Sequence, residues 1–173
     1  MMFEAFDMSE RLSIPVMIRL VTRIAHSRAG VAVRDRRPQN PLQPTRDIKK
    51  WTLLPSNARV QYSHLVDKQP ELLRLAEESS HNELSLAGPK GVIVCGIADN
   101  YLRENLAADH DMSVLSIRQY PMPANAIRRM VQHVDEVLIL EDGYPLLENM
   151  VRGLFGLEGV HVKGRMTGEV PRT

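Results

Sequence analysis

Residues 91–105, GVIVCGIADNYLREN, decide the fold class of this chain. The apolar run Val92–Cys95 is followed by Gly96 and then by apolar and polar residues at helical spacing. A short, continuous apolar run bounded by glycine is typical of a strand that is buried on both faces. The stretch therefore predicts a parallel strand that turns directly into a helix packed back on its sheet.

The same alternation of strand and helix continues toward the carboxyl end of the chain. Apolar runs followed by amphipathic segments, joined by right-handed crossovers, predict an open, mostly parallel sheet in a three-layer α/β/α unit over residues 88–165. The predicted strands are residues 91–96, 112–120, 136–141 and 160–165, and the predicted helices are residues 97–110, 123–134 and 144–156.

Upstream of residue 88 the pattern is less regular. Residues 56–84 carry apolar side chains at helical spacing, and Ser56 or Asn57 can cap this helix. Pro70 lies inside it and predicts a bend or a break, because proline lacks the amide that a helix needs. The apolar stripe of this helix consists of Ala58, Tyr62, Leu65, Leu72 and Ala76.

An N-terminal arm precedes a proline-rich break at residues 27–57. The arm is predicted to contain a helix, residues 2–13, and a strand, Val16–Val21. A single helix and a single strand cannot bury their apolar faces against each other alone, so we expect the arm to pack on something larger.

Composition and charge exclude several classes of protein. The chain has 173 residues, of which 43% are hydrophobic and 25% charged, within the range of globular domains. A formal net charge of +1 predicts no nucleic-acid partner, and the sequence contains no apolar run long enough to span a membrane. The single cysteine, Cys95, excludes disulfides within the chain and iron–sulfur ligation by a cysteine motif. We expect a cytoplasmic protein without a membrane partner.

Three loops follow the predicted strands at the edge where parallel sheets bind ligands: CGIADN, RQYPMPAN and EDGYP. None contains GxGxxG or a phosphate-binding GxxxxGK[ST] motif. In EDGYP, Glu141 and Asp142 precede a helix start, where negative charge is stabilising, and Glu148 can reach back to the first-turn amides as in a capping box. The six histidines show no metal-ligand spacing. The residues alone therefore indicate a fold without a recognisable catalytic, cofactor or metal site.

Five segments, in this order, resemble the middle of the large (alpha) subunit of indolepyruvate:ferredoxin oxidoreductase, a thiamine-diphosphate-dependent 2-oxoacid oxidoreductase. The resemblance covers essentially the whole chain. The segments are EAFDMSERLSIPVMIRLVTRIAHSRAGV, LLPSNARVQYSHLVDKQPELLRLAEESSHNEL, GVIVCGIADNYLREN, EVLILEDGYPLLENMV and VKGRMTGEVPRT.

The resemblance implies a division of the chain into four parts. Residues 1–33 are similar to the tail of an upstream pyrimidine-binding domain, and residues 34–87 to a linker and connecting helix. Residues 88–165 resemble the small transketolase-C-terminal-like domain, and residues 166–173 the lead-in to a downstream domain. The family's glutamate that activates the cofactor, its GDG motif and its cysteine-rich tail find no counterpart here.

The whole enzyme implied by this resemblance oxidatively decarboxylates arylpyruvates, with coenzyme A and ferredoxin as co-substrates and with a small (beta) subunit. Its thiamine diphosphate, magnesium and iron–sulfur clusters are expected to bind outside this chain, which is then inactive alone. The expected role is a structural middle domain between the cofactor-binding domains of the same subunit. The candidate contact residues are Arg23, His26, Glu141, Tyr144 and Glu148.

Two other interpretations stay open from the sequence. The chain can be a stand-alone flavodoxin-like module that binds a nucleotide or coenzyme A through CGIADN and RQYPMPAN. It can also be an assembly module whose N-terminal arm dimerises.

Overall fold

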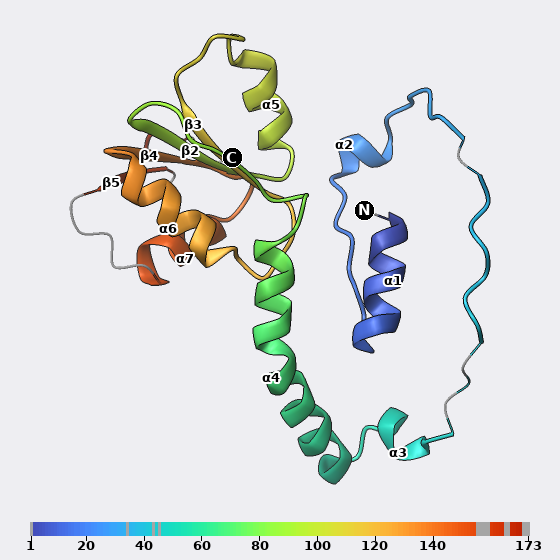
Figure 1. The fold of residues 1–173 in the computed structure, drawn as a ribbon. Coiled ribbons are helices and arrows are strands. Elements are labelled where there is room, and N and C mark those ends of the chain that lie inside the picture. Colours follow the sequence, from blue (N-terminus) through green and yellow to red (C-terminus); the bar gives the residue numbers. More distant parts are fainter. Residues whose placement is uncertain are drawn as a thin grey trace. The chain divides into compact units, whose positions relative to one another are not determined.

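A five-stranded sheet forms the centre of the carboxyl-terminal part of the protein (Figure 1). The computed structural model describes residues 2–33, 35–42, 44, 46–154, 160–164 and 167–170. The chain divides into an N-terminal unit, Met1–Leu42, and an α/β unit, Gln43–Thr173.

In the N-terminal unit the predicted helix is confirmed as α1 (Met2–Leu12). Residues 37–40 return to this helix: Arg37 donates to Asp7 Oδ2 at 2.9 Å, and the Asn40 amide donates to Glu10 Oε2 at 2.5 Å. A one-turn helix, α2 (Thr22–Ala25), follows the extended residue Val21.

The predicted strand Val16–Val21 is wrong. Residues 15–21 form neither helix nor strand, and they pair with no strand among the described residues. The segment has the β-branched residues of a strand, but a strand also needs a neighbour to complete its ladder of hydrogen bonds.

The α/β unit begins with α3 (Ile48–Trp51) and the long helix α4 (Pro55–Glu77). α4 begins at Pro55, one residue before the predicted caps, because proline's fixed φ suits the first helical position. It runs through Pro70 without a break, so the predicted split does not occur. The helix ends seven residues before the predicted end at residue 84.

Strands and helices then alternate as predicted. The elements are β1 (Glu83–Ser85), β2 (Lys90–Cys95), α5 (Ala98–Asn105), β3 (Ser113–Ile117), α6 (Ala124–His133), β4 (Glu136–Leu140), α7 (Leu146–Leu154) and β5 (His161–Lys163). The sheet order is β1-β3-β2-β4-β5, and only β1 is antiparallel to its neighbour. The predicted three-layer α/β/α architecture with an open, mostly parallel sheet is confirmed.

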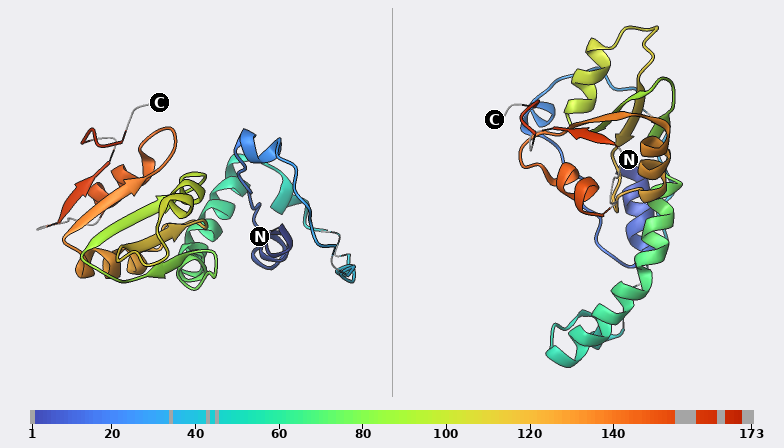
Figure 2. Two further views of the ribbon diagram at one scale, coloured as in Figure 1. Left: turned by 90° about the horizontal axis from the view of Figure 1, so that it is seen from above. Right: turned by 90° about the vertical axis from the view of Figure 1, so that its left-hand side faces the viewer.

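Helices cover both faces of this sheet. α5 lies on one face, and α6 and α7 lie on the other (Figures 1 and 2). On β2, both Val92 and the following residue Ile93 are fully buried, although their side chains point to opposite faces. This two-sided burial explains why the strand appears in the sequence as an unbroken apolar run.

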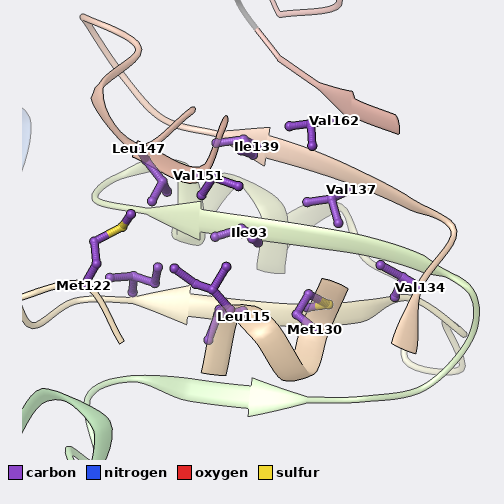
Figure 3. Packing of buried hydrophobic residues seen from close by; sticks show 12 residues of the cluster. Ile93, Leu115, Met122, Met130, Val134, Val137, Ile139, Leu147, Val151 and Val162 are labelled. Carbon is purple, nitrogen blue, oxygen red and sulfur yellow. The ribbon is translucent and has the colours of Figure 1, made fainter. Parts of the chain in front are cut away.

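The hydrophobic core lies between the sheet and the two helices α6 and α7 (Figure 3). Ile93, Leu115 and Ile139 project from adjacent strands toward these helices, and Leu147 and Val151 of α7 meet them. The apolar side chains of α6 and α7 therefore face the core, as the helical spacing predicted.

β1 is the strand that the sequence prediction missed, because residues 83–85 were assigned to the preceding helix. The Asn82 side chain explains the change of structure. Its Oδ1 accepts the backbone amides of Arg118 and Gln119 at 2.8 and 2.9 Å, and its Nδ2 donates to the Gln119 carbonyl at 2.9 Å. Asn82 thereby holds the chain beside the end of β3, where β1 pairs.

Candidate functional site

The carboxyl edge of the sheet brings the three candidate loops together, as the parallel strands require. At this edge, α7 begins immediately after the EDGYP loop that follows β4. The Glu141 carboxylate accepts the amides of Leu147 and Glu148 at 2.7 and 3.0 Å, and Glu141 is buried. Glu141 therefore satisfies the first amides of α7, and its negative charge lies at the positive end of that helix.

For Glu148 the structure gives a contact with a basic residue of its own helix in place of the predicted contact with a first-turn amide. Its buried carboxylate instead accepts the Arg152 Nε at 2.9 Å, one helical turn further on. The first-turn amides of Leu147 and Glu148 already donate to Glu141. Arg152 also donates to the Val162 carbonyl, so the pair ties α7 to β5.

Gly164, just after β5, packs directly on this carboxylate. A Cβ atom at residue 164 would lie 2.5 Å from Glu148 Oε2 and 2.8 Å from Glu148 Cδ. A side chain at this position would have to displace the Glu148 carboxylate, which Arg152 holds.

A second carboxylate holds the start of α6, after the loop RQYPMPAN. Glu77, the last residue of α4, accepts the amides of Asn125 and Ala126 at 2.7 and 3.3 Å. The residue preceding α6 is Pro123, which provides no side-chain cap, so Glu77 takes that place from a distant part of the chain.

The third loop, CGIADN, leads to a network of charged groups around Asp99. The buried Asp99 carboxylate accepts Arg118 Nε at 2.9 Å, Arg103 Nε at 3.0 Å and the Ser116 hydroxyl at 2.9 Å. Glu83 of β1 accepts the same two arginines at 3.0 and 2.7 Å. Two acids and two arginines thus balance each other and connect β1, β3 and α5.

The network sets the protonation of both acids. Burial by itself raises the pKa of Asp99, but hydrogen bonds from Arg118 and Ser116 outweigh it and hold this pKa below the ordinary value. Hydrogen bonds from Arg118 and Arg103 lower the pKa of Glu83. Both acids are therefore charged at neutral pH, and neither is suited to act as a general base near pH 7.

The predicted contact residues divide between the two units. Arg23 and His26 lie on α2 and at its C-cap in the N-terminal unit, and both are exposed. Tyr144, in the α/β unit, is 74% exposed, whereas its neighbours Glu141 and Glu148 are buried.

The sequence reasoning missed Glu77, Asn82, Glu83 and Arg118 as organising residues. A charged residue at the end of an otherwise buried strand, as Arg118 is after β3, was the signal that a partner carboxylate would be needed.

The described residues do not form a metal site. The described residues contain no group of three or more His, Cys, Asp or Glu side chains placed to hold a metal ion. The buried carboxylates of Asp99, Glu141 and Glu148 are bonded to arginines or backbone amides. A magnesium ion would therefore find no group of oxygen ligands among the described residues.

An open groove of about 440 Å³ lies between α5 and the strands β1 and β3. Its walls include Leu102, Leu106 and Val114. Glu83 and Arg103, which are bonded to each other, contribute charged atoms to the same walls.

None of the helices that the structure describes is long and apolar enough to cross a membrane.

Similarity to known proteins adds what the geometry does not show. The indolepyruvate oxidoreductase subunit IorA of Methanothermobacter thermautotrophicus is 32% identical over 179 aligned residues, which cover 98% of this chain. The IorA subunits of Methanothermobacter marburgensis and Archaeoglobus fulgidus are 31% and 28% identical over 98% and 96% of the chain. The chain is related to the IorA subunits of indolepyruvate oxidoreductase. The resemblance predicted from five sequence segments is thereby confirmed.

This IorA-related chain spans less than a third of those relatives: 29% of each Methanothermobacter subunit and 27% of the Archaeoglobus subunit. No protein-family model and no solved structure matches it.

Proposed function

We propose that the IorA-related chain is a structural part of an indolepyruvate oxidoreductase subunit and does not itself carry the active centre. The observation that supports this most directly is the alignment with IorA subunits over nearly the entire chain. These relatives are subunits by name, so this role includes assembly with other polypeptide segments.

The reaction proposed for the whole enzyme is the oxidative decarboxylation of indolepyruvate and other arylpyruvates, with coenzyme A and ferredoxin. Thiamine diphosphate would supply the carbanion chemistry, and iron–sulfur clusters would carry electrons. The described residues form no metal site, so we assign the binding of these groups to polypeptide outside this chain. This chain then contributes structure: it holds the flanking domains at a defined spacing.

The internal bonds of the α/β unit suit a spacer. Glu77 and Asn82 fix the end of α4 to the loops after β3, and Arg118 joins the same region to Asp99. A helix anchored by several bonds at one end keeps its direction, which is what a rigid spacer between flanking domains needs. Among the predicted contact residues we favour Tyr144, Arg23 and His26, whose side chains are exposed.

A segment exchange tests the proposal. Residues 1–173 replace the aligned segment of the Methanothermobacter thermautotrophicus IorA subunit, which is then expressed with its companion polypeptides. We expect indolepyruvate-dependent ferredoxin reduction within about tenfold of the parent enzyme. A second exchange, with an unrelated α/β domain of similar length, provides the control and is expected to be inactive.

An assembled chimaera with no activity would contradict the proposal, as would oxidation of indolepyruvate by the isolated chain. No observation favours the alternative of a nucleotide- or coenzyme-A-binding module. The first amides of α6 and α7, where a phosphate would bind, already donate hydrogen bonds to the carboxylates of Glu77 and Glu141. A phosphate would have to displace these negative charges.

A further inference from the structure

α4 carries a stripe of residues spaced alternately by four and three positions, as in a coiled coil. Its carboxyl-terminal end is already buried within the α/β unit: Ala76 is fully buried, Leu72 is half-buried, and Glu77 bonds to α6. The stripe consists of Ala58, Tyr62, Leu65, Gln69, Leu72 and Ala76.

The middle of the same helix face is bare. Tyr62, Leu65, Val66 and Leu73 are 68%, 42%, 49% and 42% exposed, and they lie within about 100° of one another around the helix axis. We name these four residues the α4 seam. These residues form three turns of apolar surface that continue a buried stripe, so they are not scattered surface residues. Such a surface indicates a binding site for a second helix.

The charges at the border of the α4 seam restrict its partner. Arg59 lies on one side of the stripe and Lys68 on the other, as their helical positions require, whereas Asp67 lies on the opposite face. On the border of Arg59 the one acid, Glu77, is bonded to the amides of α6, so the charges beside the exposed part of the stripe are Arg59 and Lys68. If two α4 helices paired antiparallel, like borders would face each other and a basic border would meet a basic border, which disfavours a second copy in that orientation.

We propose that the α4 seam binds an amphipathic helix of another polypeptide, whose apolar heptad stripe is flanked by aspartate or glutamate. The apolar stripe of that helix would cover Tyr62, Leu65, Val66 and Leu73. Its carboxylates would face Arg59 and Lys68 and set its orientation. This inference stands on the surface of α4 and does not depend on the proposed enzyme.

The test uses the full chain and two labelled synthetic peptides of about three heptads, both with leucine at the a and d positions. One peptide has glutamate at the flanking positions, and the other has lysine. Fluorescence anisotropy measures the Kd of each peptide. We expect the glutamate peptide to bind at least about tenfold more tightly, and added salt to reduce the difference.

The chain provides a matched pair of variants on one helix. Val66 and Val60 are 49% and 53% exposed, but Val60 lies on the face of α4 away from the seam. Val66→Asp is expected to raise the Kd of the glutamate peptide by about tenfold or more, and Val60→Asp is expected to leave this Kd unchanged. In the double variant Arg59→Glu, Lys68→Glu, the preference should reverse toward the lysine peptide. Circular dichroism confirms that the helix content of each variant is retained.

Three results would overturn the proposal. The first is equal binding of the two peptides or none of either, and the second is an equal effect of the two valine variants. The third is self-association that sedimentation shows to be lost in Val66→Asp but kept in Val60→Asp, because the seam would then be covered by a second copy.

Discussion

Asp99 is the buried charge on which the sheet edge depends most. Its side chain is 4% exposed and faces Arg118, which is 26% exposed. Removing one member of a buried ion pair leaves the other charge without compensation and costs about 3 kcal/mol. We expect Asp99→Asn to lower the free energy of unfolding by about that amount in urea denaturation followed by circular dichroism.

Glu83→Gln is the matched control, because Glu83 bonds the same two arginines from a half-exposed position. Its loss should stay below about 1 kcal/mol, as is usual for surface ion pairs. Equal losses in the two variants would show that burial of Asp99 is not what makes the network stabilising.

The same network predicts a loss of stability in acid. The pKa values of Asp99 and Glu83 are lowered from ordinary values of 3.8 and 4.5, so their contribution is complete above those values and disappears as the pH falls through the lower, folded-state pKa. Unfolding free energies measured from pH 7 to pH 3 should fall below about pH 4.5. The difference between the wild-type chain and Asp99→Asn should shrink over that interval, and a constant difference would contradict the assignment.

Gly164 and Gly153 provide a second contrast between single residues. Gly164→Ala places a methyl group against the Glu148 carboxylate and should destabilise by about 1–3 kcal/mol. Gly153→Ala, inside α7, meets no atom within 4 Å and should stabilise by up to about 1 kcal/mol. Thermal unfolding of both variants measures the difference, and a stabilising Gly164→Ala would refute the packing described.

At the scale of the element, α6 depends on a residue of another helix for its cap. Glu77→Ala removes the carboxylate that accepts the Asn125 and Ala126 amides, so we expect a loss of about 1 kcal/mol and faster hydrogen exchange at both amides. Glu78→Ala is the neighbouring control, since among the described residues Glu78 forms a surface pair with Arg74 that is worth about 0.5 kcal/mol. Unchanged exchange at Asn125 in Glu77→Ala would contradict this account.

Element boundaries also separate local from non-local causes. α4 and the apolar strand β2 follow from local spacing, whereas β1 exists because Asn82 bonds to residues after β3. Val16–Val21 shows the converse: local strand propensity produces no strand where the described residues provide no neighbour.

For the whole molecule, the proposal predicts how the chain responds to the cofactor of its proposed parent enzyme. A ligand present at about 1,000 times its Kd stabilises the folded state by about 4 kcal/mol, which raises Tm by roughly 10 °C in a protein of this size. We expect millimolar thiamine diphosphate with magnesium to leave the Tm of the isolated chain unchanged. A shift of that size would place a micromolar site within the chain and contradict the proposed division of labour.

The sequence by itself determined the alternation of strands and helices after residue 88, the apolar stripe of α4 and the relation to indolepyruvate oxidoreductase subunits. Each of these features depends on residues that are close together in the chain, or on the order of segments along it. The tertiary structure decided which acid caps which helix, where β1 pairs and how Asp99 is neutralised. Glu77 and Asn125, or Asp99 and Arg118, lie far apart in sequence, and only the folded chain brings their atoms within hydrogen-bonding distance.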